Sequence, residues 1–574
     1  MSDSDLLYHG NSSSHFACQT GPTRNAPGSS RVRQVMKGIV MSDNPPPIGV
    51  QPPSPSGTDY SQHLSRGLSL FHNVALGFGA VSPVIGLYST AAVGLALAGA
   101  SWLWVLPIAL AGNCLLLYLY SELARQFPIA GGAYQWTRRL IGPRYAWFAG
   151  WFAICGLMAS LTTLAYLGSP WILSLLSIEA TPLRLVATAV IFNIVCALAN
   201  LGGVNFLKRM LNFGVGAEFA ASLLVGIALL LWFRNRPISS LWDFSTYSQL
   251  GFGSVSVSLA LLAVAGWAFI GFDACIAGAE ETKNSSRNVP RALWYSMLSV
   301  GGLVFLNALS IALAHPDLSH VASGEDLDPV TTSVVANFGA WSDKPFVATV
   351  VIAFIACGLA ANTQVSRLIW SISRDGVLPG STFLRRVHGN RRVPSYAILV
   401  TGILACAGLV LALNDRAIGT LVAYGTGGMY LTFSLIAIAG LVGRLSGRWK
   451  PQGSPRRRRV GLIVNVSAVA WLVFETTNIV WPRPALNPPD AQWYQLWAAP
   501  LVSAGVFVIG WAYFIVARPA AKLISVLPSA DDQGFTVGDP DAPDTVVSLG
   551  TDSPASEYDP EVGTDRRSVA SARE

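Results

Sequence analysis

Two acidic side chains lie within otherwise apolar stretches of the chain, and they are its strongest candidates for chemistry. Asp273 lies in the run GWAFIGFDACIAGAEETKN, residues 266–284, and Glu218 lies in NFGVGAEFAASLLVG, residues 212–226. If these stretches cross a membrane, each carboxyl group is costly to bury, and such groups commonly mark pathways for ions or substrates. We therefore predict functional roles for both residues: Asp273 and Glu218 could couple the protein's activity to a proton, and Glu218 could instead form part of a site for an amine.

Each acid also has a purely structural interpretation. Asp273 follows Gly271 by two residues, so it could cap the restarted half of an interrupted helix, where the helix dipole stabilises a negative charge. Glu218 could face a polar neighbour such as Asn113 and serve only packing. The sequence alone leaves both interpretations open.

A second pair of acids, Glu280 and Glu281, ends the run that holds Asp273. These two residues lie at the expected end of a membrane span, not at its centre. We expect them to pair with Lys283, Arg287 or the loop after residue 372. In that position they would shape an inner gate and would not contact the substrate.

The composition of the chain is that of an integral membrane protein. Of its 574 residues, 12% are charged and 52% are hydrophobic, and the mean hydropathy is +0.46. Stretches long enough to cross a hydrocarbon core of about 30 Å recur along the sequence. We predict an all-α fold with twelve transmembrane helices, in approximate bounds 68–98, 102–124, 145–174, 182–201, 210–233, 253–279, 291–315, 345–372, 394–413, 417–443, 460–481 and 497–517.

The segments outside these stretches are too polar to pack into a core. We expect a disordered N-terminal tail over 1–63, a transporter domain over 64–518 and a disordered acidic tail over 519–574. No basic segment followed by an apolar one occupies the first 30 residues, which indicates insertion through the first span without a cleaved signal peptide.

Loop charge predicts the orientation, because Lys and Arg are retained on the cytoplasmic side during insertion. The loops after even-numbered spans hold 21 Lys and Arg residues, whereas those after odd-numbered spans hold six. Both tails are therefore expected in the cytoplasm, and we expect the protein in the plasma membrane. The net charge of +7 follows from this topology, so no nucleic-acid partner is implied.

Two spans contain helix-breaking residues at corresponding places. The first, 68–98, holds Gly77, Gly79, Pro83 and Gly86, and the sixth, 253–279, holds its own pair of glycines. Such matched interruptions are typical of transporters in which two inverted repeats of five helices form a site near the membrane midplane. Alternatively, the glycines and prolines only allow kinks or close packing.

Three motifs resemble those of one transporter superfamily. They are SELARQFPIAGGAYQWTRRLIGPRYAWFAGW at 121–151, GWAFIGFDACIAGAEETKNSSRNVPRAL at 266–293 and SRDGVLPGSTFLRRVHGNRRVPSYA at 373–397. Their order and placement resemble the amino acid/polyamine/organocation superfamily, and most nearly its amino acid/choline branch, which includes permeases for 4-aminobutyrate and choline. The resemblance implies a 5+5 inverted repeat with interrupted first and sixth helices, followed by two extra helices.

The same resemblance implies the substrate site. Backbone amides where the first helix restarts would bind a substrate carboxylate, and carbonyls freed in the sixth helix would accept hydrogen bonds from its ammonium group. Two aromatic residues would form a wall or gate through cation–π contact, although such residues in membrane helices more often serve packing. The implied site residues are Ser82, Val84, Ile85, Gly86, Trp267, Phe269, Ile270 and Gly271.

Other classes of protein fit the sequence less well. A membrane enzyme needs a catalytic cluster at one depth, but none of the seven histidines is central to an expected span. A channel would favour a repeated pore loop or a charged ring, and neither is visible. We therefore predict a proton-coupled permease without a cofactor or metal, with an exchanger or uniporter, or a non-transporting amino-acid sensor, as alternatives.

Overall fold

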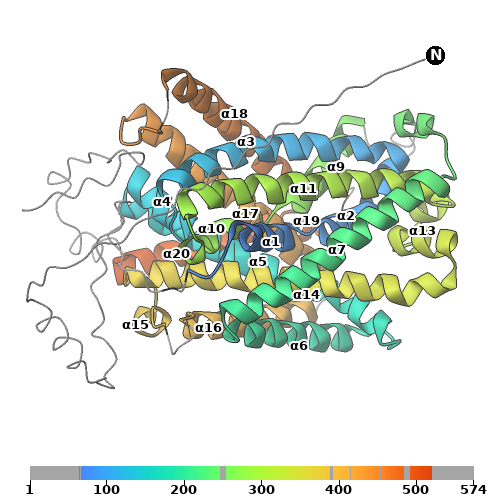
Figure 1. Cartoon of the computed structure of the whole chain (residues 1–574), viewed down its shortest axis with the longest axis horizontal. Helices are drawn as coiled ribbons and strands as arrows, with labels where there is room; N and C mark the ends of the chain where they lie inside the picture. The colour runs from blue at the N-terminus through green and yellow to red at the C-terminus, as the bar shows by residue number, and fades with distance from the viewer. Residues whose placement is uncertain are drawn as a thin grey trace, which may run out of the picture. The chain divides into compact units, whose positions relative to one another are not determined.

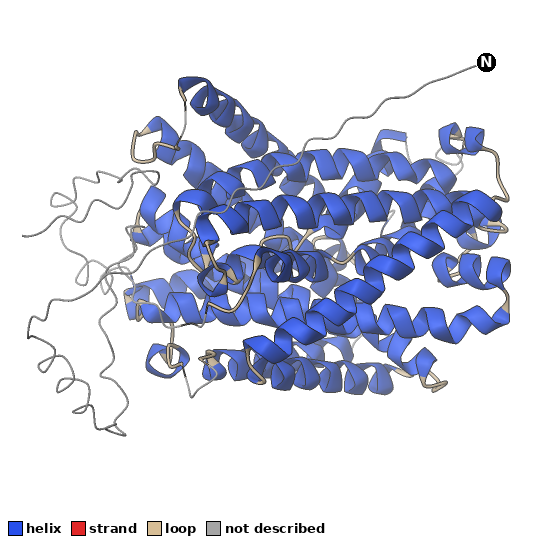
Figure 2. Ribbon diagram, in the orientation of Figure 1, coloured by secondary structure: helices blue, strands red, loops and turns tan. Residues whose placement is uncertain are grey.

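The described part of the chain is helical throughout. The computed structural model describes Leu64 and residues 66–245, 254–387, 392–413, 415–452, 454–483, 486 and 491–519. Within these residues the only extended pairing is an isolated bridge between Leu68 and Thr282, and no strand is present (Figure 2). Nearly all of both expected tails lies outside the described residues, so the division into tails and a transporter domain stays a prediction.

The helices follow one another along the chain with short connections. The first half comprises α1 (Leu70–Val81), α2 (Pro83–Ala98), η1 (Gly99–Trp104), α3 (Val105–Gln126), α4 (Gly132–Leu140), α5 (Pro143–Leu175), α6 (Pro182–Leu201), α7 (Val204–Trp232), η2 (Ile238–Trp242), α9 (Ser254–Ala265), η3 (Gly266–Phe269), α10 (Ala274–Ala277) and η4 (Ala279–Glu281). The second comprises α11 (Ser285–Ala314), α12 (Leu318–Ala322), α13 (Pro329–Phe338), η5 (Ala340–Ser342), α14 (Asp343–Arg374), α15 (Ser381–Leu384), α16 (Ser395–Gly408), η6 (Leu409–Leu413), α17 (Asp415–Leu445), α18 (Pro455–Val480), α19 (Trp493–Leu496) and α20 (Ala498–Ala517).

Several helices start where the sequence carries a capping residue followed by proline. Thr181 precedes Pro182 at the start of α6, and Ser454 precedes Pro455 at the start of α18. Each side-chain oxygen accepts a hydrogen bond from an amide of the first turn. Proline suits the first helical position because its missing N–H would have no partner there.

Eleven helical stretches of the described chain are long and apolar enough to cross a membrane. The first of them, Leu70–Gln126, has 57 residues and covers all but the first two residues of the expected span 68–98 together with the whole of 102–124. The other ten each correspond to one expected span. The prediction of an all-helical, multi-pass membrane protein is therefore confirmed.

The helices divide into central and peripheral ones. In the most apolar stretches of α5 and α14, 72% of residues are buried, against 28% in α7 and α18 and 11% in α20. Large apolar side chains such as Phe213, Leu231 and Val516 are exposed on the peripheral helices. These side chains suit contact with lipid, because hydrocarbon tails are as apolar as the side chains themselves. Figure 1 shows α1 and α10 in the middle of the bundle, among the longer helices.

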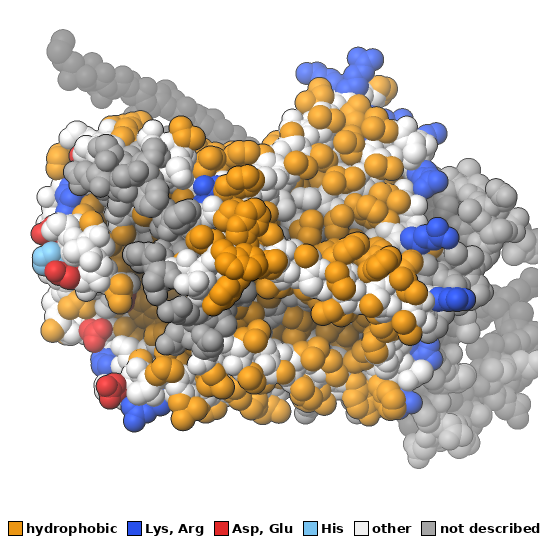
Figure 3. Space-filling model, turned by 180° about the vertical axis from the view of Figure 1, so that it is seen from behind, with side chains coloured by type: hydrophobic (Ala, Val, Ile, Leu, Met, Phe, Trp, Pro, Cys, Tyr) orange, Lys and Arg blue, Asp and Glu red, His pale blue; other side chains and the backbone are white. Residues whose placement is uncertain are grey.

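Charged side chains concentrate at the two ends of the helices. In Figure 3 a broad hydrophobic band separates an edge lined by Lys and Arg from an opposite edge where Asp, Glu and His also appear. We call the first edge the basic end; it holds the connection between α3 and α4 and the segment after α14.

Candidate functional site

The first expected span is interrupted at Ser82. Helix α1 ends at Val81, Ser82 adopts φ 52°, and α2 restarts with Pro83 at its first position. Proline removes an amide donor and disfavours helical backbone in the residue before it, which explains why the break falls here.

The sixth expected span is interrupted at a matching depth. A short 3₁₀ turn, η3, ends at Phe269, Ile270 is extended, and Gly271 has φ +107° before α10 begins. This backbone region is freely accessible only to glycine. Both breaks therefore lie where the sequence predicts them.

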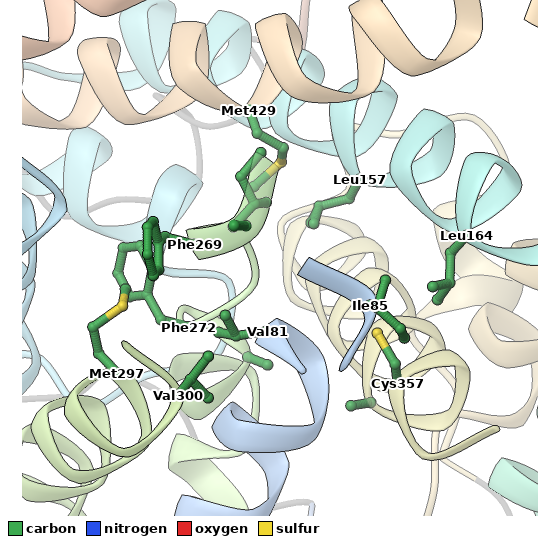
Figure 4. Close-up of a cluster of buried hydrophobic side chains, with 14 of the residues drawn as sticks. Val81, Ile85, Leu157, Leu164, Phe269, Phe272, Met297, Val300, Cys357 and Met429 are labelled. Carbon is green, nitrogen blue, oxygen red and sulfur yellow. The ribbon is translucent and has the colours of Figure 1, made fainter. Parts of the chain in front are cut away.

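The two breaks contact each other through their backbones. A Cβ atom added to Gly271 would lie 2.6 Å from the Ala80 carbonyl oxygen, and one added to Gly86 would lie 2.9 Å from that of Ala268. The glycines thus allow the interrupted segments to cross in direct contact. Figure 4 shows side chains from both breaks in one apolar cluster with residues of α5, α11, α14 and α17.

Glu218 from α7 binds the restarted end of the first interrupted helix. Its Oε1 accepts hydrogen bonds from the Ser82 hydroxyl at 2.5 Å and from the Val84 amide at 3.1 Å. The Glu218 side chain is fully buried, and its Oε2 has no hydrogen-bond partner among the described residues. Glu218 therefore belongs to the interruption itself.

Asn113, the polar neighbour that the sequence suggested for Glu218, is not its partner; Ser82 and Val84 are. The Asn113 amide nitrogen donates to the Ala109 carbonyl and, at 3.1 Å, to the Tyr430 hydroxyl. The Tyr430 hydroxyl in turn donates to the Gly266 carbonyl. Asn113 thus supports the second interrupted segment, and the first is bound by Glu218.

The amides expected to bind a substrate carboxylate have partners within the protein. The Val84 amide donates to Glu218, the Ile85 amide to the Ser82 hydroxyl, and the Gly86 amide to the Ser82 carbonyl. A substrate carboxylate at this position would have to displace the Glu218 carboxylate. The assignment of these residues to substrate binding stays a prediction.

Asp273 occupies the N-cap position of α10, yet its side chain accepts no hydrogen bond from the first-turn amides. The capping hypothesis therefore lacks its defining interaction. The carboxyl group faces a cavity lined by residues of six elements or their flanking loops, and its Oδ1 is buried without a partner in the described chain. The lining residues are Tyr120, Gly131, Gly132, Ala133, Ala153, Leu157, Asp273, Ile276, Ala277, Gln364, Leu368, Met429 and Thr432.

The cavity is small and lies toward the basic end. Its free volume is about 30 Å³, which is room for about two water molecules. An amino acid or amine would fit only after the surrounding helices separate. Gln364 of α14 also faces this cavity, and its side-chain amide interacts with the Asp273 carboxyl group.

Phe269 and Trp267, the two aromatic residues expected in the substrate site, lie outside the cavity that Asp273 faces. Phe269 is 1% exposed and packs in the central cluster of Figure 4, and Trp267 is partly buried against the same core. Neither residue lines the cavity around Asp273. Both flank the second break, so a role in the site depends on helix movement.

Four ion pairs hold together the basic end. Glu280 binds Arg374 at 2.8 Å and Glu281 binds Arg367 at 3.1 Å, both from α14. The other two pairs are Arg138 with Asp375 and Glu122 with Arg444. The expectation that the segment after residue 372 supplies a partner is confirmed for Glu280, because Arg374 lies there. Glu281 pairs instead with Arg367, which lies within α14 and was not among the expected partners.

Two backbone hydrogen bonds join the two interrupted segments at the basic end. The Leu68 amide donates to the Glu281 carbonyl at 2.8 Å, and the Lys283 amide donates to the Leu68 carbonyl at 2.9 Å. The residues just before α1 and just after η4 are therefore tied together at the basic end. Sequence reasoning missed this link because such pairing leaves no local signal in side-chain type.

These features define a class of protein: a multi-pass helical membrane protein with two interrupted helices that meet at its centre is built as a transporter. The family model described as "Amino acid permease" matches residues 68–509. The chain belongs to this family, within the amino acid/polyamine/organocation superfamily, and it is a transporter rather than an enzyme.

The similar proteins include amino acid permeases and an importer of an amine. The chain is 26% identical to the amino-acid permease BAT1 of Arabidopsis thaliana, over 79% of this chain and 92% of the relative. It is 27% identical to the branched-chain amino acid permease BcaP of Bacillus subtilis, over 64% and 81%. It is 26% identical to the low-affinity putrescine importer PlaP of Escherichia coli, over 51% and 63%.

Proposed function

We propose that the protein is a secondary active transporter that moves amino acids or related amines by alternating access, coupled to protons. The observation that carries this proposal is the direct contact of two interrupted helices, each with a buried carboxyl group at its break. We further propose twelve membrane crossings in a 5+5 inverted repeat followed by two extra helices, because Leu70–Gln126 spans two expected crossings.

Alternating access would open the small cavity toward the basic end. The four ion pairs there close the path between Asp273 and the aqueous side. Because residues before α1 and after η4 are linked through their backbones, the basic-end halves of both interrupted helices would move together. Substrate would then leave past Asp273 once these ion pairs separate.

A proton is a better coupling ion for this site than sodium. A sodium site would draw on carbonyls at the first break and oxygen atoms of α14. At that position the Cys357 thiol of α14 donates to the Ala80 carbonyl, with a sulfur–oxygen distance of 3.4 Å. A thiol donor occupies the place where a hard cation would need another oxygen ligand.

Replacing Asp273 by asparagine should separate binding from accumulation. The amide keeps the size of the side chain but cannot be ionised, so the variant should bind substrate while losing acid-stimulated accumulation and retaining exchange. The measurement is uptake into proteoliposomes at external pH 5.5 and 7.5. Glu475→Gln, in α18, is the matched control because it removes a buried acid whose hydrogen bond is to Asn478 and not to either break. Undiminished acid-driven uptake by Asp273→Asn would overturn the proton role.

Flux itself distinguishes the proposed function from its alternatives. Purified protein in proteoliposomes should accumulate radiolabelled substrate from a panel of neutral amino acids, 4-aminobutyrate, choline and diamines, and should do so without sodium. Uptake only into vesicles preloaded with substrate would indicate an exchanger. Binding without any flux would indicate a sensor.

The proposed topology places both tails in the cytoplasm and the segment between α11 and α14 outside. Ser323, in that segment, is exposed, so Ser323→Cys should react with a membrane-impermeant maleimide on intact cells. Ser446, an exposed residue after α17, is the matched control and should react as Ser446→Cys only after permeabilisation. The opposite pattern would invert the orientation.

A further inference from the structure

The N-terminal end of α2 is already occupied by a carboxyl group of the protein. Oε1 of Glu218 accepts from the Ser82 hydroxyl and the Val84 amide, which is where a free helix terminus would otherwise bind an anionic group. Helix α2 has 16 residues, so the field at its N-terminus is substantial. This geometry leaves no free anion-binding terminus at the first break.

Glu218 and Asp273 lack basic partners. Glu218 Oε2 and Asp273 Oδ1 are buried without hydrogen bonds, and no described Lys, Arg or His lies within ion-pair distance of either. The buried guanidinium of Arg367 is committed to Glu281 at the basic end. The middle of the bundle therefore offers carboxyl oxygens as acceptors, and a carboxylate buried there requires a proton or a cation to neutralise it.

An aromatic cluster that includes Tyr88 of α2 lies beyond the turn bound by Glu218, on the side away from the basic end. Tyr88 lies one helical turn after Val84, and its ring centroid is 5.8 Å from both those of Trp171 and Phe346. The carboxyl groups of Glu218 and of Asp328 both act electrostatically on Tyr88. Burial raises the pKa of Asp328, which caps α13 outside the membrane-spanning segments. Aromatic faces next to carboxylates are a recognised environment for organic ammonium ions.

We propose that the site selects organic amine cations that lack a carboxylate, with Glu218 as the specificity-determining residue. An ammonium group would approach the free Oε2 of Glu218 beside the aromatic cluster. An α-amino acid would bring its own carboxylate against Glu218, where like charges repel in a poorly solvated site. This inference rests on the proposed transport function and names its substrate class.

The test compares pairs of compounds that differ only by the carboxylate. Purified full-length protein is titrated with 1,4-diaminobutane against ornithine and with isopentylamine against leucine, and binding is followed by thermal stabilisation. Uptake of the same four compounds is measured in proteoliposomes. We expect each amine to bind at least about tenfold more tightly than its amino acid, a difference of about 1.4 kcal/mol.

A substitution at Glu218 tests the residue itself. Glu218→Gln retains an oxygen for the Val84 amide but removes the charge, so amine affinity should fall at least about tenfold while the preference over the amino acid disappears. Glu475→Gln removes another buried acid and should leave both affinities unchanged. The melting temperature without ligand shows whether each variant is folded; if Glu218→Gln is not, Glu218→Asp, which keeps the charge, should still prefer amines.

Each result separates this inference from the proposed function. Amino acids that bind and accumulate as well as the amines would overturn the selectivity and leave the transporter intact. Selective amine binding without flux would support the selectivity and count against transport. Binding of neither amine would overturn the inference.

Discussion

Replacing Gly271 by leucine is expected to lower the initial rate of uptake at least about 100-fold. A displacement of about 1 Å in precisely positioned groups has an effect of about this size. Gly271 has φ +107°, and an added Cβ would lie 2.6 Å from the Ala80 carbonyl oxygen. The substitution therefore combines backbone strain of about 1–3 kcal/mol with a collision between two backbones. Gly86→Leu should act similarly, because its Cβ would meet Ala268.

The measurement compares uptake by variants present at equal amounts in the membrane. Gly302→Leu is the matched control: Gly302 lies in α11, and an added Cβ would meet nothing within 4 Å. This control should transport normally, since its side chain extends into open space. Normal uptake by both Gly271→Leu and Gly86→Leu would refute the proposed site at the crossing of the two breaks.

The second large effect is expected at the buried ion pair between Arg367 and Glu281. Both side chains are 1% exposed, so removing one partner leaves an uncompensated buried charge. Such a change typically costs about 3–5 kcal/mol. Arg367→Leu should therefore markedly lower the melting temperature of the purified protein and the yield of monodisperse protein.

The double variant identifies the cause. Arg367→Leu combined with Glu281→Leu removes both charges, and its stability should recover most of the loss, because apolar replacement of a whole buried pair is often neutral or better. The exposed pair Arg184–Glu179, at 4.0 Å, is the control and should contribute little when Arg184 is replaced. A double variant as unstable as the single one would show that packing of Arg367, not charge, is responsible.

The class of the protein and the location of both breaks could be predicted from local sequence. Long apolar stretches determine helices in a membrane, because every backbone polar group must be satisfied within its own segment. Pro83 and Gly271 interrupt two of those stretches through backbone constraints that each residue imposes by itself. Asp273 and Glu218 could be recognised as candidate functional residues, because the apolar residues around each one in its own segment already show that its carboxyl group is costly to bury.

The partners of those residues depended on the tertiary structure. Glu218 contacts Ser82 and Val84, which lie 136 and 134 positions away in the sequence. Glu281 pairs with Arg367 and not with its neighbour Lys283. Hydrogen bonds and ion pairs act over a few ångströms, so their formation requires the packed positions of α2, α7 and α14. Sequence alone determined where a helix must break and where a charge is buried; only the packing of distant helices decided which group binds the broken end.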